Sequence, residues 1–220
     1  MLKDKIFIAF IFASILSVLM YFNMNSTLSV YLVHHRGLGL EKFGAILSLN
    51  AGLVVLLQMG VTRWTAHWKL MLAIALGNFL YVIGFSMYGL VDSYGMYLTA
   101  MVIITIGEMI CAPKEQTLVA DLAPVHMRGR YMAIRSFAWI IPVAFGPLGA
   151  GVIMDNFDPR LLWLAAGLVG SDSVVGFLML HRKAGTAISA RLQASQSEME
   201  ERSAAGGGLR LEPEPIAAAD

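Results

Sequence analysis

Six long apolar segments restrict this 220-residue chain to one class of fold. An α-helix needs about 20 mostly apolar residues to cross a bilayer, because each residue adds about 1.5 Å along its axis. The segments that meet this requirement are residues 6–33, 43–62, 68–90, 95–115, 131–154 and 161–180. Buried helices of a water-soluble protein would be shorter, or would show an apolar stripe opposite a polar face. We therefore expect an all-α integral membrane protein with six spans.

The composition supports a membrane protein and excludes several other classes. Apolar residues make up 57% of the chain and charged residues only 14%, against about 25% charged in soluble domains. A net charge of +1 without a basic stripe excludes a nucleic-acid partner. The single cysteine, Cys111, excludes an intramolecular disulfide. The five histidines are scattered over loops and helix ends and offer no metal site, so we expect neither metal nor cofactor.

Basic residues predict how the spans are oriented, because lysine and arginine accumulate on the cytoplasmic side of a membrane. One side of the predicted topology carries Lys3, Lys5, Arg63, Lys69, Arg128, Arg130, Arg182, Lys183 and Arg191. The other side carries only Arg36, Lys42 and Arg160. This asymmetry predicts that both termini are cytoplasmic, and we expect a multi-pass protein of the plasma membrane.

The composition changes after the sixth span. Residues 182–220 are rich in alanine, serine, glycine and glutamate and contain little apolar material that a core could bury. We expect a disordered cytoplasmic tail, with helix formation limited to about residues 188–202.

Glu108 is an acidic residue deep in the fourth span. It lies about 20 Å from Gly95, counted at 1.5 Å per residue. A charge at this depth costs about 2.5–3.5 kcal/mol on insertion scales and commonly marks an ion or proton pathway. Two interpretations remain open: a proton- or cation-coupling residue, or a structural carboxyl group hydrogen-bonded within the bundle. Just beyond it, Pro113 deprives the Met109 carbonyl of its helical partner, which loosens the helix there.

Several short motifs follow one another over roughly residues 2–180: Lys3-Asp4-Lys5-Ile6-Phe7, Phe43-Gly44, Val61-Thr62-Arg63, Gly107-Glu108, Leu122-Ala123-Pro124, Arg128-Gly129-Arg130-Tyr131-Met132 and Gly146-Pro147-Leu148-Gly149-Ala150-Gly151. Taken in this order, they resemble the C-terminal six-helix half of a major facilitator superfamily (MFS) transporter, particularly its drug/proton antiporter branch. The first cytoplasmic loop keeps only Gly60 and Arg63 of the family's glycine-aspartate-arginine-glycine-arginine signature, which favours the C-terminal half over the N-terminal one.

The resemblance implies a half-bundle built as a 3+3 inverted repeat. In that fold the first, second, fourth and fifth helices of a half line the substrate cavity. The substrate-cavity candidates are therefore Tyr21, Asn25, Asn50 and Gln58, together with Glu108 as the coupling residue. The alternative for each amide is an interhelical hydrogen bond, worth about 0.6 kcal/mol on average.

The resemblance also assigns roles near the membrane surface and in the fifth span. Arg63, Asp121, Arg128 and Arg130 are candidates for a cytoplasmic gate, the alternative being that these charges only set the topology. Gly146, Pro147, Gly149 and Gly151 are expected to form a tight packing face against a neighbouring helix. Asp172 has no functional interpretation; its candidate partner is Arg135, although their depths match poorly.

Together these observations predict secondary active, proton-coupled efflux of a small solute across a lipid bilayer. A membrane enzyme is not expected, because no G-x-S-x-G motif and no mid-span histidine occurs. A channel lacks its filter motif and an arginine-rich sensor helix. The partner we expect is a second six-helix half: a separate chain, a lost N-terminal half or a second copy in a homodimer. The alternative is a truncated or remnant half-transporter with no independent activity.

Overall fold

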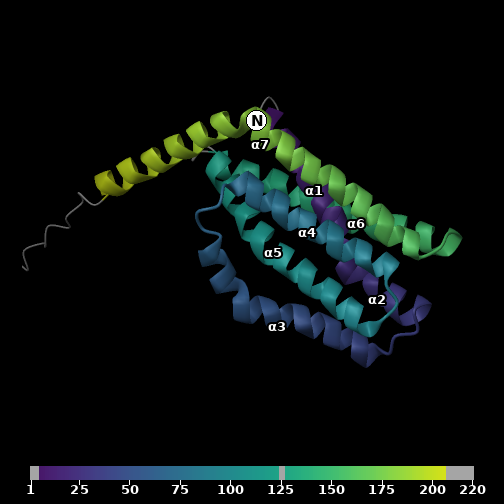
Figure 1. The fold of residues 1–220 in the computed structure, drawn as a ribbon. Coiled ribbons are helices and arrows are strands. Elements are labelled where there is room, and N and C mark those ends of the chain that lie inside the picture. The colour runs from purple at the N-terminus through teal and green to yellow at the C-terminus, as the bar shows by residue number, and fades with distance from the viewer. Residues whose placement is uncertain (1–4, 124–126, 207–220) are drawn as a thin grey trace, which may run out of the picture.

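The computed structural model describes residues 5–123 and 127–206, and these are almost entirely helical (Figure 1). The elements are α1 (Lys5–Ser26), α2 (Leu28–Val30), the π-helical turn η1 (Tyr31–His35), α3 (Leu40–Trp64), α4 (Leu70–Leu90), α5 (Tyr94–Leu122), α6 (Arg128–Asn156) and α7 (Arg160–Gly206). Six helices are long and apolar enough to cross a membrane: α1, α3, α4, α5, α6 and the Arg160–Lys183 part of α7. The prediction of six spans is confirmed.

Successive helices run in opposite directions, so the bundle has two ends. The Lys5 end carries the start of α1, the turn between α3 and α4, and the junction of α5 with α6. The Arg36 end carries the connections at residues 36–39, 91–93 and 157–159 (Figure 1).

The helix contacts follow a pseudo-twofold pattern. The main pairs are α4 with α5, α4 with α7, α1 with α7, α1 with α6, and α3 with α5. Exchanging α1 with α5, α3 with α6 and α4 with α7 reproduces this set of pairs, and each exchanged pair runs in opposite directions through the bundle. The described helices therefore form the predicted 3+3 inverted repeat.

Close backbone contact occurs between α4 and α5. A Cβ atom at Gly77 would lie 2.7 Å from the carbonyl oxygen of Gly107, and one at Gly107 would lie 2.6 Å from that of Gly77. Without side chains at these positions the two helices approach closely, which strengthens dispersion contacts in a membrane protein.

The glycines of the fifth span, which were expected to form a tight packing face, have few close neighbours within this bundle. A Cβ atom at Gly146 would make ordinary contacts with Leu19 and Phe22 of α1, whereas one at Gly149 or Gly151 would have no neighbour within 4 Å. The tight helix contact inside this bundle is therefore formed by α4 and α5 and not by the Gly146–Gly151 stretch of α6.

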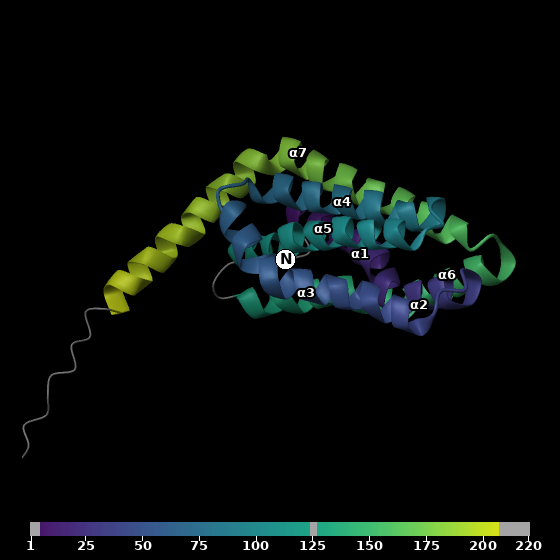
Figure 2. The same cartoon turned by 60° about the horizontal axis from the view of Figure 1, so that its bottom comes forward.

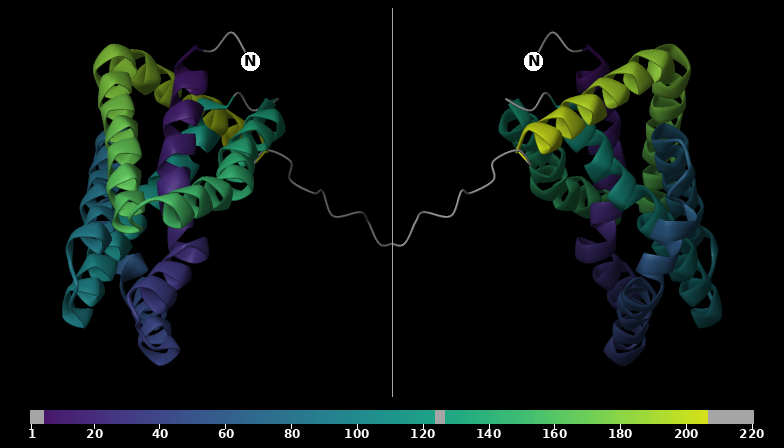
Figure 3. Two further views of the ribbon diagram at one scale, coloured as in Figure 1. Left: turned by 90° about the vertical axis from the view of Figure 1, so that its right-hand side faces the viewer. Right: turned by 90° about the vertical axis from the view of Figure 1, so that its left-hand side faces the viewer.

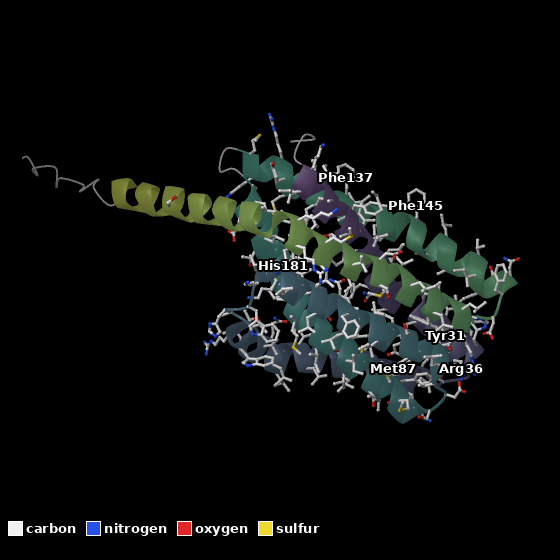
Figure 4. All side chains as sticks on the ribbon, turned by 45° about the horizontal axis from the view of Figure 1, so that its top comes forward. Tyr31, Arg36, Met87, Phe137, Phe145 and His181 are labelled. Atoms are coloured by element: carbon white, nitrogen blue, oxygen red, sulfur yellow. The ribbon has the colours of Figure 1, made fainter. Side chains whose placement is uncertain are left out.

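Helices α3 and α6 are the least covered members of the bundle. In the most apolar stretch of each span, 6% of the residues of α3 and 22% of those of α6 are buried inside the bundle. The corresponding share is 50% in α1, α4 and α5. In Figure 2, α3 lies at the margin of the bundle, and in Figure 4 the labelled Phe137 and Phe145 of α6 point outward. The pseudo-twofold relation of the inverted repeat maps α3 onto α6, so these two helices occupy equivalent positions.

Several element boundaries differ from the sequence prediction. The first span, predicted as one segment over 6–33, is interrupted after Ser26. The side chains of Asn23 and Ser26 donate to carbonyls four residues earlier, at 2.8 and 3.1 Å, in competition with the regular backbone pattern. The fourth span, predicted to end at 115, continues to Leu122.

The last helix is longer than predicted. The segment at 182–220 was expected to be a disordered tail, but the backbone is helical through Gly206, and this part of α7 projects away from the other helices (Figures 1 and 3). The sequence between 184 and 202 consists largely of good helix formers without proline. Residues 207–220 of the predicted tail lie outside the described residues.

Candidate functional site

Glu108 lies near the middle of α5 and is held by side chains from two other helices. The Tyr21 hydroxyl of α1 donates to Glu108 Oε1 at 2.8 Å, and Asn50 Nδ2 of α3 donates to Oε2 at 3.0 Å. Asn50 Nδ2 also lies 3.0 Å from Thr105 Oγ1, one turn earlier on α5. Three residues predicted from the sequence thus meet at one half-buried point of the bundle.

The partners of Glu108 are all neutral. In the described part of the chain, no lysine or arginine forms an ion pair with this carboxyl group. Neutral donors hold both oxygens in place without supplying a permanent counter-charge. A proton or a cation from outside the bundle can therefore fill that role, which a built-in arginine would block.

Gln58 does not contact Glu108, and the Asn25 side chain reaches this site only through hydrogen bonding with Tyr21. Gln58 Nε2 donates to the Met109 carbonyl at 3.2 Å and to Thr62 Oγ1 at 2.9 Å. The Met109 carbonyl is the one that Pro113 deprives of its helical partner, so Gln58 replaces a missing backbone donor. Asn25 is exposed, one turn beyond Tyr21 on α1.

A cavity of about 90 Å³ adjoins Glu108 on the side of the Lys5 end. Its wall includes Tyr21, Glu108, Glu115, Arg135 and Trp139. The rings of Tyr21 and Trp139 are 6.2 Å apart, centroid to centroid, in an edge-on arrangement. The cavity thus joins aromatic faces to two carboxyl groups from the same helix.

Glu115 and Arg135 are functional candidates that the sequence analysis missed. Glu115 is only 6% exposed, and its Oε2 lies 3.4 Å from an Arg135 guanidinium nitrogen. The fourth span was expected to end at Glu115, which would have placed this carboxyl group at the membrane surface. A spacing of seven residues from Glu108 puts both acids on one face of α5, and this signal could have identified it.

Arg135 pairs with Glu115 and not with Asp172, the partner considered from the sequence. Asp172 is exposed on α7, beside an apolar groove of about 520 Å³ between α1 and α7.

The predicted cytoplasmic gate residues all lie at the Lys5 end. Asp121 at the end of α5 interacts electrostatically with Arg128 at the start of α6. Arg63 and Arg130 are exposed at the ends of α3 and α6.

An ion cluster joins two connections and the start of α7 at the Arg36 end, and the sequence analysis did not anticipate it. Asp92 pairs with Arg36 and also accepts from Arg160, at 2.9 and 3.1 Å. Arg36 Nε donates further to the Tyr97 hydroxyl at 3.1 Å. Figure 4 shows Arg36 beside Tyr31 at this end, with His181 at the other.

Comparison with known proteins places the chain among transporters. The family model of the Major Facilitator Superfamily matches residues 10–206. The chain is 30% identical over 185 residues to the uncharacterized MFS-type transporter YttB of Bacillus subtilis (strain 168), covering 83% of this chain and 46% of that protein.

Two further relatives have more specific names. A Na(+), Li(+), K(+)/H(+) antiporter of Planococcus maritimus is 25% identical over 198 residues, covering 81% of this chain and 45% of that protein. The multidrug resistance protein MdtH of Escherichia coli (strain SMS-3-5 / SECEC) is 27% identical over 128 residues, covering 56% and 32%. The chain spans about half the length, or less, of these relatives.

Proposed function

Because the chain belongs to the Major Facilitator Superfamily, we propose that it is one six-helix half of a secondary active transporter that exports a small solute in exchange for protons. The printed names of two relatives, a cation/proton antiporter and a multidrug resistance protein, support exchange and efflux as the type of transport. The observation that carries the proposal is the position of Glu108, held mid-span by the neutral side chains of Tyr21 and Asn50.

Glu108 is the proposed coupling residue. When it is protonated, the site is neutral; when it is ionised, it can attract a cation or a polar group of the substrate. Tyr21 and Asn50 come from α1 and α3, so a change of charge at Glu108 acts directly on the contact between three helices. This is the link between protonation and helix position that an antiporter requires.

The substrate would bind on the same side of the bundle. Tyr21 and Asn50 line this face beside Glu108, Asn25 lies one turn away, and Gln58 supports α5 from α3. Apolar side chains are normal on a lipid-facing surface, but a carboxyl group is not. A second six-helix half that covers α3 and α6 would close the cavity around these residues and keep Glu108 away from lipid. Gly149 and Gly151 would then pack against that half.

We place this assembly in the plasma membrane with both termini in the cytoplasm, following the distribution of lysine and arginine. In this orientation the Lys5 end, with the gate candidates Asp121 and Arg128, faces the cytoplasm.

Exchange of Glu108 for glutamine tests the coupling role. Transport is measured in proteoliposomes that carry the chain and its second half, with a pH-sensitive dye inside and Na⁺, K⁺ or tetraphenylphosphonium added outside. We expect Glu108→Gln to fold normally and to lose at least about 90% of pH-driven flux, because an amide cannot release a proton. Glu41→Gln, on the exposed start of α3, is the matched control and should transport like the wild type.

Unchanged pH-driven flux in Glu108→Gln would refute the coupling role. Absence of flux for every probe in the wild type, with the assembly folded, would instead support an inactive half-transporter.

A further inference from the structure

Glu115 is a buried acid for which the proposed transport mechanism has no use so far. It lies seven residues after Glu108 on α5, about 10.5 Å nearer to the Lys5 end. Both carboxyl groups line the same cavity of about 90 Å³. At about 30 Å³ per molecule, this space holds up to about three waters, and the two carboxyl groups offer them hydrogen-bonding partners.

The surroundings of Glu115 form a polar layer through the bundle. Two apolar core clusters lie on either side of it, one around Trp163 and Tyr88 and the other around Phe7 and Phe177. The buried polar residues between these clusters include Ser14, Ser17, Asn78 and Glu115. Ser17 donates to the Asn78 side-chain oxygen, and Asn78 also lies within hydrogen-bonding reach of Glu115. The layer extends the polar region from Glu108 toward the Lys5 end.

The ion pair of Glu115 with Arg135 is weakly made. A structural arginine–carboxylate pair is typically bidentate, with nitrogen–oxygen distances of about 2.7–2.9 Å. Here one contact of 3.4 Å is formed, and Arg135 Nε has no hydrogen-bond partner among the described residues. The side chain of Arg135 is 17% exposed and that of Glu115 only 8%, so the guanidinium group can turn toward solvent when its partner loses its charge.

From this geometry we propose that Glu115 is a second proton-carrying residue, which exchanges protons with Glu108 through the cavity and connects the coupling site to the Lys5 end. The proposal rests on the proposed role of Glu108. In the transfer step, a proton leaves the Glu108 carboxyl group, passes along water in the cavity and joins the Glu115 carboxylate. Glu108 becomes ionised, Glu115 becomes neutral, and the summed charge of the two stays the same.

Arg135 makes this step reversible. It pairs with Glu115 while Glu115 is ionised and is released when Glu115 becomes neutral. The other titratable side chains that line the cavity are Tyr21 of α1, Tyr81 of α4 and Cys111 of α5 itself. Among the described residues, none from α3 or α7 lines it. Arg135 is therefore the only described cationic side chain in this wall, and it sets the charge that Glu115 must balance.

The first test is flux in the reconstituted assembly with Glu115→Gln, which keeps the size of the side chain and can still accept from Arg135. We expect at least a tenfold loss of pH-driven flux of tetraphenylphosphonium, with its exchange at equal pH on both sides retained. Glu115→Asp should restore part of the loss, and Glu41→Gln serves again as the control. A purely structural ion pair predicts pH-driven flux at the wild-type level, and that result would overturn the proposal.

The second test needs no transport. Infrared difference spectra of the chain in nanodiscs report the carbonyl band of each protonated carboxyl group after a pH step. Two of these bands should respond to the variants at the site, one being absent in Glu108→Gln and the other absent in Glu115→Gln. If Glu115→Gln does not fold, Glu115→Asp identifies its band by a shift.

The two bands separate the two proposals. A missing Glu108 band would count against the proposed coupling residue. A missing Glu115 band would mean that Glu115 stays ionised beside Arg135 at every pH, and this would overturn the relay alone.

Discussion

Among single residues, Pro113 and Gln58 show how far sequence reasoning reaches at the candidate site. The sequence shows that Pro113 frees the Met109 carbonyl, because that is a local property of the helix. It cannot show that Gln58, 51 residues earlier, donates to that carbonyl, because this depends on how α3 packs on α5. Both residues were singled out from the sequence, and an interhelical hydrogen bond was the alternative to a cavity role for Gln58, but the sequence did not identify the Met109 carbonyl as its acceptor.

Because Gln58 bonds the carbonyl that Pro113 leaves free, substitutions at Gln58 and Pro113 should have non-additive effects on the free energy of unfolding. Gln58→Leu should lower the free energy of unfolding by about 0.6 kcal/mol, the average size of an interhelical hydrogen bond in a membrane protein. In a Pro113→Ala background the new backbone N–H bonds the Met109 carbonyl, so the same substitution should cost much less. Reversible unfolding in mixed micelles measures both values.

Asn156→Leu is the control for this cycle, because its amide bonds only within α6, to the Val152 carbonyl. It should cost the same in both backgrounds. Equal costs for Gln58→Leu with and without Pro113 would contradict the role assigned to Gln58.

Lys114 and Glu115 explain why the end of the fourth span was misplaced. Two adjacent charges after a proline favour a helix end at the membrane surface. In the folded chain, Lys114 Nζ donates to the Thr65 carbonyl at the end of α3, at 2.8 Å, and Glu115 pairs with Arg135. A cation at the carboxyl end of a helix is favourable, so the charges are accommodated and α5 continues. Neither partner is adjacent in the sequence.

At the scale of whole elements, the positions of the spans were predictable and their packing faces were not. Helix formation in a bilayer follows from the length of an apolar run. Which glycines lie between helices depends on the rotation of each helix about its axis. Gly77 and Gly107 lie at the α4–α5 contact, although the motif at Gly146–Gly151 is richer in glycine.

A pair of alanine substitutions tests this assignment. At Gly107 a methyl group would lie 2.6 Å from the Gly77 carbonyl oxygen, so Gly107→Ala should destabilise the chain by about 1–3 kcal/mol. At Gly149 the methyl group meets nothing within 4 Å, and alanine favours a helix over glycine, so Gly149→Ala should leave stability unchanged or raise it. Thermal unfolding of the purified chain compares the two. Equal stability would contradict the close α4–α5 contact.

At the scale of the whole molecule, the inverted repeat leaves α3 and α6 in equivalent, poorly covered positions. The family resemblance gave the repeat and the four helices that line the cavity, but it did not indicate that the second and fifth spans, α3 and α6, would be the least covered. The ion cluster of Asp92 with Arg36 and Arg160 also emerged only from the structure, because its three residues are distant from one another in the chain.

We predict that a monomer of this chain alone does not move substrate. One half-bundle supplies one wall of a pathway, and its polar face would meet lipid on the open side. The particle mass in detergent, together with flux after reconstitution without a second half, checks this expectation. Saturable, pH-dependent flux from a strictly monomeric particle would overturn it.

The length of α7 has a mechanical consequence. Of its 47 residues, Arg160–Lys183 can cross the membrane, and the rest continue as helix to Gly206. At 1.5 Å per residue, the part of the helix after Lys183 is about 35 Å long. If the bundle rocks by about 10° and the helix follows rigidly, simple leverage at that length moves its tip by about 6 Å. The end of the helix would therefore move farther than the half-bundle itself, and a fluorophore fused after it would report the tilt of the half-bundle.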